Sequence, residues 1–121
     1  MMITREFAVS FAAEWIAAWN ARDLPRVLAH YTEDFEMSSP FIIKFAGERS
    51  GTLQGKDKVR AYWQAALDKN SGLHFELLDM FVGAGSLTLH YRRETGKRVT
   101  EVLFFNEEGL VYRAAAQYHE H

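Results

Sequence analysis

The first part of the chain carries hydrophobic residues at helical spacing. A helix is predicted from Thr4 to Asn20, because Phe7, Phe11 and Trp15 recur every fourth residue while charged side chains occupy the other faces. The Thr4 hydroxyl can accept an otherwise unpaired backbone N–H at the start of this helix. After a tight connection, Asp23 can cap a second, antiparallel helix, whose first turn tolerates a proline.

The second helix is expected to bury a stripe of side chains that ends at Tyr31, after which the helical pattern breaks. Phe35 to Ser38 is predicted to form a short strand that Pro40 ends. A third helix is predicted to begin at Gly55 and to stop at the Asn-Ser-Gly sequence of residues 70–72.

Beyond residue 72 the hydrophobic pattern changes from helical to alternating. Four strand-like segments follow, separated by turn sequences: Leu73 to Val82, Ser86 to Arg93, Val99 to Phe105 and Leu110 to His119. Their order predicts an antiparallel meander. Helices first and sheet second predict an α+β fold in which the helices pack on one face of a curved sheet.

The alternation in the last strand predicts which of its side chains point inward. The apolar set is Leu110, Tyr112, Ala114, Ala116 and Tyr118. If a turn at residues 106–109 pairs Phe105 with Leu110, Leu103 lies opposite Tyr112, and Glu101 lies opposite Ala114 on the inward face. A register shifted by one residue would instead expose Glu101, since Val102 and Phe104 are also apolar.

The composition is that of an ordinary small globular protein. The chain has 121 residues, 48% of them hydrophobic, and 14 Lys and Arg against 16 Asp and Glu give a net charge of -2. A chain of this length can bury one core, so we expect a single domain over residues 1–121. The near-neutral charge argues against a nucleic-acid partner, because phosphate-binding domains usually carry a basic excess.

Several kinds of site and location are not expected from this sequence. The chain has no cysteine, which excludes disulfides, thiolate metal sites and cysteine catalysis. No segment has the length and hydrophobicity of a membrane span, and the first residues lack the pattern of a signal peptide. We therefore expect a cytoplasmic protein without a membrane partner.

The histidines and the basic start of the third helix suggest no metal or cofactor. His90 is expected on the outer sheet face, because its neighbours at alternate positions are apolar. The other histidines show no metal-ligand spacing beyond the terminal His-Glu-His; they are His30, His74, His119 and His121. Residues 56–60 mix basic and acidic side chains, which is typical of a solvated helix face.

Three segments give the chain a resemblance to a known superfamily. They are the sequence WIAAWNARDL at residues 15–24, the sequence YTEDF at residues 31–35 followed by Ser39-Pro40, and Gly55 with Val59 and Trp63. Together they resemble the nuclear transport factor 2-like (NTF2-like) superfamily, in the branch that contains ketosteroid isomerases and SnoaL-like polyketide cyclases. The resemblance implies a cone-shaped fold around one deep apolar cavity, often in a homodimer.

The catalytic positions implied by this resemblance are only partly occupied. The position of the ketosteroid isomerase tyrosine holds Trp15, that of the aspartate base holds Ser39, and that of the strand acid holds Glu101. A serine cannot remove a proton from carbon without a base of its own, so we do not expect a standard ketosteroid isomerase. A SnoaL-like cyclase needs a strand carboxylate or histidine, and Glu101 is available for that role.

Two classes of function stay open from the sequence. In the first, Glu101 is the catalytic acid or base of an isomerase, cyclase or lyase that acts on a small apolar ligand; in the second, the domain binds a ligand or dimerises without catalysis. The residues expected to contact the ligand are Trp15, Ser39, Tyr62, Trp63, Tyr91, Leu103 and Tyr118. Each aromatic residue could equally be plain core, and Ser39 could simply end a strand.

The strand from residue 99 to 105 also predicts an interface. It is apolar on both faces, whereas a strand with one solvated face should alternate. We therefore expect a homodimer formed through the outer sheet face, with Val102 and Phe104 near its centre.

Overall fold

The computed structural model describes residues 1–120, which form helices and one six-stranded sheet. In chain order the elements are α1 (Arg5–Asn20), α2 (Leu24–Leu28), β1 (Tyr31–Ser38), η1 (Ile42–Ala46), β2 (Thr52–Gln54), α3 (Lys56–Lys69), β3 (Phe75–Val82), β4 (Ser86–Arg93), β5 (Arg98–Phe105) and β6 (Val111–Tyr118). Here η1 is a single turn of π-helix.

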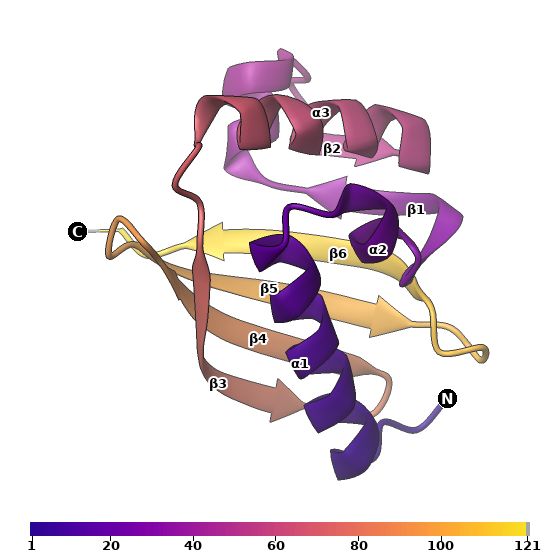
Figure 1. Ribbon diagram of the computed structural model, residues 1–121. Helices are drawn as coiled ribbons and strands as arrows, with labels where there is room; N and C mark the ends of the chain where they lie inside the picture. Colours follow the sequence, from indigo (N-terminus) through magenta and orange to yellow (C-terminus); the bar gives the residue numbers. More distant parts are fainter. Residues whose placement is uncertain (121) are drawn as a thin grey trace.

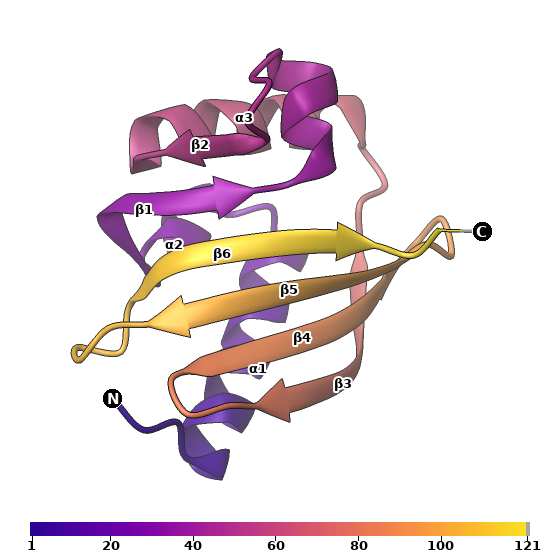
Figure 2. The same ribbon diagram turned by 180° about the vertical axis from the view of Figure 1, so that it is seen from behind.

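The helices lie on one side of the curved sheet. Its strand order is β2-β1-β6-β5-β4-β3, and neighbouring strands are antiparallel except for the parallel pair of β1 and β6. Figure 1 shows α1 crossing the face of β3 to β5, while α3 runs along the edge formed by β1 and β2. From behind, the sheet lies in front of α1 (Figure 2). The expected α+β fold, with the four-strand meander, is confirmed.

The helices begin where the capping residues predict. The Thr4 hydroxyl accepts a hydrogen bond from the Phe7 N–H at 3.1 Å, and the Asp23 carboxylate accepts one from the Arg26 N–H at 3.2 Å. Gly55 precedes α3 with a φ of 97°, a conformation that favours glycine. No helix within residues 1–120 is both long enough and apolar enough to cross a membrane.

Three short features differ from the sequence prediction. Tyr31 begins β1 rather than ending the buried stripe of the second helix, and β1 is therefore longer than the predicted strand. The sequence between residues 32 and 34 is polar because these side chains face outward from an irregular start of β1, where the pairing with β6 shifts. The η1 turn and the three-residue β2 were not predicted, since neither is long enough to show a periodic pattern.

The predicted pairing of the last two strands was wrong for two reasons: Phe105 pairs with Val111 rather than Leu110 at the turn, and a β-bulge follows. Phe105 lies opposite Val111, whereas Phe104 lies opposite Arg113, so Tyr112 is an extra residue between them. Consequently Tyr112 is 46% exposed, and Val111 is buried in its place.

The displaced turn and the bulge together shift every later partner along the two strands by two residues. Leu103 lies opposite Ala114 rather than Tyr112, and Glu101 lies opposite Ala116 rather than Ala114. The side chain of Glu101 nevertheless faces inward and is only 7% exposed. The alternative register, with Glu101 on the outside, is therefore not the one adopted.

Candidate functional site

A cavity of about 740 Å³ lies between α3, the segment around η1 and the inward face of the sheet. Most of its wall is apolar or aromatic and comes from α3, from the residues that follow β1, and from β3 to β6. Cavities of this size commonly hold a drug-sized molecule, with a few polar groups that fix its orientation. The polar groups in this wall therefore define the candidate site.

Glu101 is the acidic residue of the cavity wall. It projects from β5, and its Oε1 accepts a hydrogen bond of 3.2 Å from the Tyr91 hydroxyl on β4. Burial raises its pKa from 4.5 to about 7, and the Tyr91 hydrogen bond partly opposes that rise. Both protonation states of this carboxyl are thus accessible near neutral pH.

Three tyrosines share the cavity with this carboxyl: Tyr62 from α3, Tyr91 from β4 and Tyr118 from β6. Burial is the main reason that their pKa values lie above the usual tyrosine range, and the nearby Glu101 charge raises them further. Their hydroxyls therefore stay protonated at neutral pH. Since Tyr91 already donates its proton to Glu101, the hydroxyls of Tyr62 and Tyr118 can donate hydrogen bonds to a ligand oxygen.

Ser39 is both a cavity residue and a structural one. It is buried, and its Oγ accepts a hydrogen bond from the Phe41 N–H at 3.1 Å, which helps to turn the chain after β1. Its hydroxyl also lowers the pKa of Tyr62 and Tyr118, against the larger effect of burial. No other carboxylate or histidine within residues 1–120 lines the cavity to act as a base for Ser39.

Two of the residues expected to contact a ligand lie elsewhere. Trp15 is buried, and its indole N–H donates a hydrogen bond of 2.9 Å to the Tyr31 hydroxyl. Leu103 is fully buried two residues further along β5 than Glu101, on the same face. Both belong to the packed core and not to the cavity wall, whereas Ser39, Tyr62, Trp63, Tyr91 and Tyr118 all line the cavity.

The sequence analysis missed part of the cavity wall. Phe41 and Phe45 come from the turn around η1, and their rings stack with centroids 5.7 Å apart. Their spacing of four residues is a helical signal, but the turn is too short for it to stand out. Lys58 is exposed as predicted, yet it also lies at the cavity with Lys69 and Arg93.

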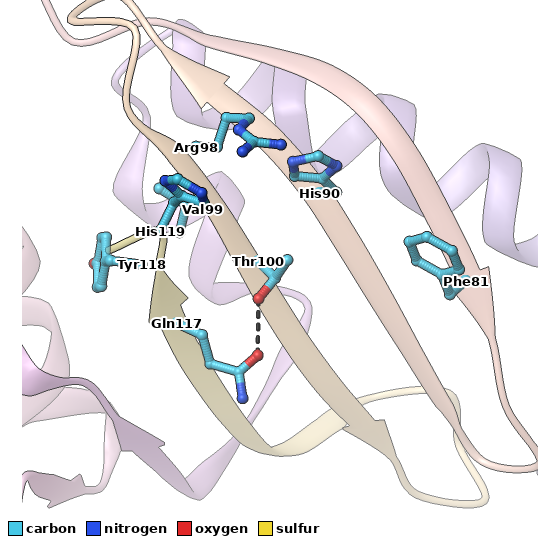
Figure 3. A pocket seen from close by; sticks show the side chains of 8 residues that line it. All are labelled: Phe81, His90, Arg98, Val99, Thr100, Gln117, Tyr118 and His119. Atoms are coloured by element: carbon cyan, nitrogen blue, oxygen red, sulfur yellow. Dashed lines mark hydrogen bonds between the residues drawn. The ribbon is translucent and has the colours of Figure 1, made fainter. Parts of the chain in front are cut away.

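A second hollow lies on the outer face of the sheet and shares two lining residues, Val99 and Tyr118, with the cavity. Figure 3 shows His90, Arg98, Thr100 and Gln117 around a shallow hollow of about 290 Å³, with a hydrogen bond of 2.8 Å from Thr100 to Gln117. His90 lies on this outer face, as predicted, while its neighbours on β4, Leu89 and Tyr91, are buried.

The described residues offer no cluster of metal ligands. Within residues 1–120, no three His, Asp or Glu side chains gather closely enough to hold a metal ion. Of the terminal histidines considered above, His121 lies outside the described residues.

Comparisons with known proteins place this fold and cavity in a family. The family model described as a SnoaL-like domain matches residues 12–116. A SnoaL-like protein of unknown function from Burkholderia thailandensis is 46% identical, with a TM-score of 0.95 over 99% of this chain and 100% of that one. No curated protein matches the chain.

More distant structures share the fold. An Agrobacterium tumefaciens protein, provisionally named an isomerase of the SnoaL-like family, is 20% identical over 93% of this chain and 97% of its own, with a TM-score of 0.73. A Sinorhizobium meliloti protein, provisionally named a polyketide cyclase, is 14% identical over 89% and 94%, with the same TM-score. On the matched residues 12–116 and the similarity to the Burkholderia protein, this chain belongs to the SnoaL-like family.

Proposed function

We propose that this protein is an acid–base enzyme, an isomerase, cyclase or lyase, that acts on a small apolar substrate in the 740 Å³ cavity. The observation that carries the proposal is the Glu101 carboxyl, which is buried at the cavity wall with a pKa of about 7. Two structures that share the fold are provisionally named an isomerase and a polyketide cyclase, and reactions of both kinds can proceed by proton transfer.

Glu101 suits a proton-transfer role for two reasons. A catalytic acid or base works best when its pKa lies near the working pH, because both protonation states are then populated. The Tyr91 hydrogen bond also fixes the carboxyl at one oxygen, while Oε2 has no hydrogen-bond partner within residues 1–120. In the proposed step, protonated Glu101 gives its proton to a carbonyl or enolate oxygen, or the carboxylate takes a proton from carbon.

The surroundings of Glu101 do not support a standard ketosteroid isomerase. At the position of the family base stands Ser39, and the cavity lining described by residues 1–120 holds no carboxylate or histidine other than Glu101 to assist it. At the position of the family tyrosine, the Trp15 N–H is already bonded to Tyr31. Glu101 therefore acts without the usual aspartate and tyrosine.

The replacement Glu101→Gln tests this function. The amide has the shape of the acid but cannot transfer the proton, so we expect an intact fold, a loss of turnover of at least about a hundredfold, and weaker binding of ligands that accept the proton. Apolar ketones, lactones and steroids can be screened by thermal stabilisation of the wild type, followed by turnover of those that bind. Glu36→Gln, at an exposed position on β1, is the matched control.

A non-catalytic ligand-binding domain is the second candidate. It is favoured by the replacement of two family catalytic groups by Trp15 and Ser39. Unchanged ligand affinity and no turnover in either the wild type or Glu101→Gln would support it. A Glu101 carboxyl that titrates near 4.5 by NMR would contradict its role as proton donor, because the acid would then be ionised throughout the neutral range, and would leave only the base role.

We also propose that the protein forms a homodimer through its outer sheet face. Val102 and Phe104 lie half-buried on that face, and Phe81 on β3, two strands away and level with Val102, is 58% exposed. We expect light scattering to give twice the chain mass of 13.9 kDa, and Val102→Asp to shift the protein to monomer. Val9→Asp, at an exposed position on α1, should leave the dimer intact; a wild-type mass of 13.9 kDa would reject the dimer.

A further inference from the structure

The charged residues that line the cavity differ in sign between its inner wall and its opening. Glu101 is buried on the inner wall, while Lys58 and Lys69 project from exposed positions on α3. Arg93, at the end of β4, adds a third cation and is partly buried. Within the lining formed by residues 1–120, no second acid accompanies Glu101. The opening is therefore cationic.

The three cations differ in how many hydrogen bonds and ion pairs they already form with other residues. The Arg93 guanidinium donates to Glu94 at 2.8 Å and to Asn70 at 3.4 Å, which positions it and neutralises part of its charge. Lys69 forms no ion pair within residues 1–120; its Nζ lies 5.1 Å from the centroid of the Phe45 ring. Lys58 interacts with Glu48 only weakly, because its charge is the smallest of the several causes that shift the pKa of Glu48. The two ammonium groups are thus available to an incoming anion.

The sheet register sets the backbone spacing between Glu101 and one of the cations, Arg93. Glu101 lies opposite Leu89, and Arg93 lies four residues further along β4 on the same inward face. Four residues of strand span roughly 13 Å. Since both side chains extend into the cavity, a ligand that reaches from one to the other needs an elongated apolar body of similar or slightly shorter length.

Electrostatics fixes the orientation of a ligand that carries an anionic group. Burial already disfavours the charged form of Glu101, and a second negative charge beside it would disfavour it further. An anionic group is instead stabilised at the opening, where Lys69 and Lys58 supply positive charge that solvent only partly screens. The neutral, oxygen-bearing end then lies against Glu101 and the tyrosine hydroxyls.

We propose that the natural substrate is an elongated apolar carboxylic acid that also carries a carbonyl group, bound with its carboxylate at Lys69, Lys58 and Arg93 and its carbonyl at Glu101. This inference rests on the proposed function, because it assigns the substrate class of the same cavity. It goes further than that proposal because it requires the substrate to carry a carboxylate.

A matched pair of ligands separates the two proposals. The probes are ω-benzoylheptanoic acid and its methyl ester, which share the ketone and the apolar body and differ in the charged end. Their dissociation constants are measured by tryptophan fluorescence at neutral pH and low salt. We expect the acid to bind about tenfold more tightly than the ester, and this advantage to shrink as salt is added.

Charge-neutralising variants locate the effect. Lys58→Gln/Lys69→Gln removes two exposed cations from the opening and is expected to abolish most of the advantage of the acid while leaving ester binding unchanged. The control is Arg5→Gln/Arg60→Gln, which makes the same change in net charge at exposed positions outside the cavity lining. Equal loss of acid binding in this control would overturn the inference, because the effect would then come from net charge alone.

The remaining outcomes separate the enzyme proposal from the inference of an acidic substrate. If the ester binds as tightly as the acid and Glu101→Gln abolishes turnover, the inference of an acidic substrate fails while the enzyme proposal stands. If neither compound binds, both the inference and the proposed apolar cavity ligand are contradicted. If the acid binds more tightly and the preference depends on Lys58 and Lys69, the inferred ligand class holds; turnover of the acid then supports its role as a substrate, and absence of turnover contradicts that role.

Discussion

The two ends of the inward sheet face are built in opposite ways. At one end α1 lies directly on the sheet, and the rings of Phe7 and Phe11 meet the ring of Phe105 edge-on, with centroids 5.2 and 5.0 Å away. Ala8 and Ala12 on the same helix are buried, and such small side chains allow close approach. At the other end α3 and η1 cover the sheet and leave the 740 Å³ cavity. One end is filled, and the other can accept a ligand.

Glu101 and Leu103 lie at the boundary between the packed end and the cavity end. They are neighbours on the inward face of β5, and both are buried. Leu103 is enclosed by the core, whereas Glu101 meets the cavity and the Tyr91 hydroxyl. A carboxyl is tolerated at position 101 because a hydrogen-bond donor and open volume lie next to it. Position 103 offers neither.

The largest expected effect compares a leucine from each end. Leu103→Ala should lower the free energy of unfolding by about 4 kcal/mol, because it opens a cavity in a fully packed region. Leu73→Ala, at the cavity wall, should cost only about 1 kcal/mol, because its side chain is partly exposed there. Urea denaturation of both variants measures the difference, and equal losses would show that the two ends are packed alike.

The next effect is a pH dependence that depends on Glu101. Since its pKa rises from 4.5 in the unfolded chain to about 7 in the folded protein, the folded state binds the proton more tightly. Stability contributed by this group is fully present below pH 4.5, falls as the pH rises, and is lost above about pH 7. The total loss is about 3 kcal/mol.

Glu101→Gln should remove that part of the pH dependence. The difference in unfolding free energy between the variant and the wild type is measured across the same pH range, so that the contributions of other groups cancel. We expect the difference to change in favour of the variant by about 3 kcal/mol between the two ends of the range. A difference that stays constant with pH would mean that this carboxyl titrates normally in the folded protein.

Two hydrogen bonds give a smaller contrast between the same regions. Trp15→Phe leaves the buried Tyr31 hydroxyl without its indole donor in the packed core, which should cost about 2 kcal/mol. Tyr91→Phe removes the donor to Glu101 beside the cavity, where water can replace it, and should cost about 1 kcal/mol. It should also raise the pKa of Glu101 further, an effect measurable by NMR titration. A larger cost for Tyr91→Phe than for Trp15→Phe would reverse the contrast.

The sequence predicts the packed end better than the cavity. The long helices and the four strands of the meander repeat their patterns over many residues, and capping residues mark where α1 and α2 begin. The inward position of Glu101 also follows from the alternation along β6, because Ala114 and Ala116 keep their predicted inward faces and Glu101 pairs with Ala116. The cavity depends instead on Phe41 and Phe45 in a short turn, whose place over the sheet is decided by tertiary contacts such as that of Phe41 with Tyr118, with ring centroids 4.5 Å apart.

Strand pairing fails for a different physical reason. A single bulge adds one residue to β6, so the faces of its first residues are exchanged while the later ones keep theirs. Val111 and Tyr112 are both apolar, and alternation alone cannot tell which of them points inward. Trp15 and Leu103 show the related problem that burial is readable from the sequence, whereas the choice between a packed neighbour and an empty volume is not.

The smallest expected effect tests the bulge that distinguishes β6 from a regular strand. Because Tyr112 is the extra residue and is 46% exposed, Tyr112→Ala should change the free energy of unfolding by less than about 0.5 kcal/mol. Val111→Ala, next to it and fully buried, should cost about 2 kcal/mol. Urea denaturation of the pair at one protein concentration measures both values. If the pairing continued without a bulge from Leu103 and Ala114, Tyr112 would lie opposite Phe105 on the inward face, and the order of the two costs would reverse.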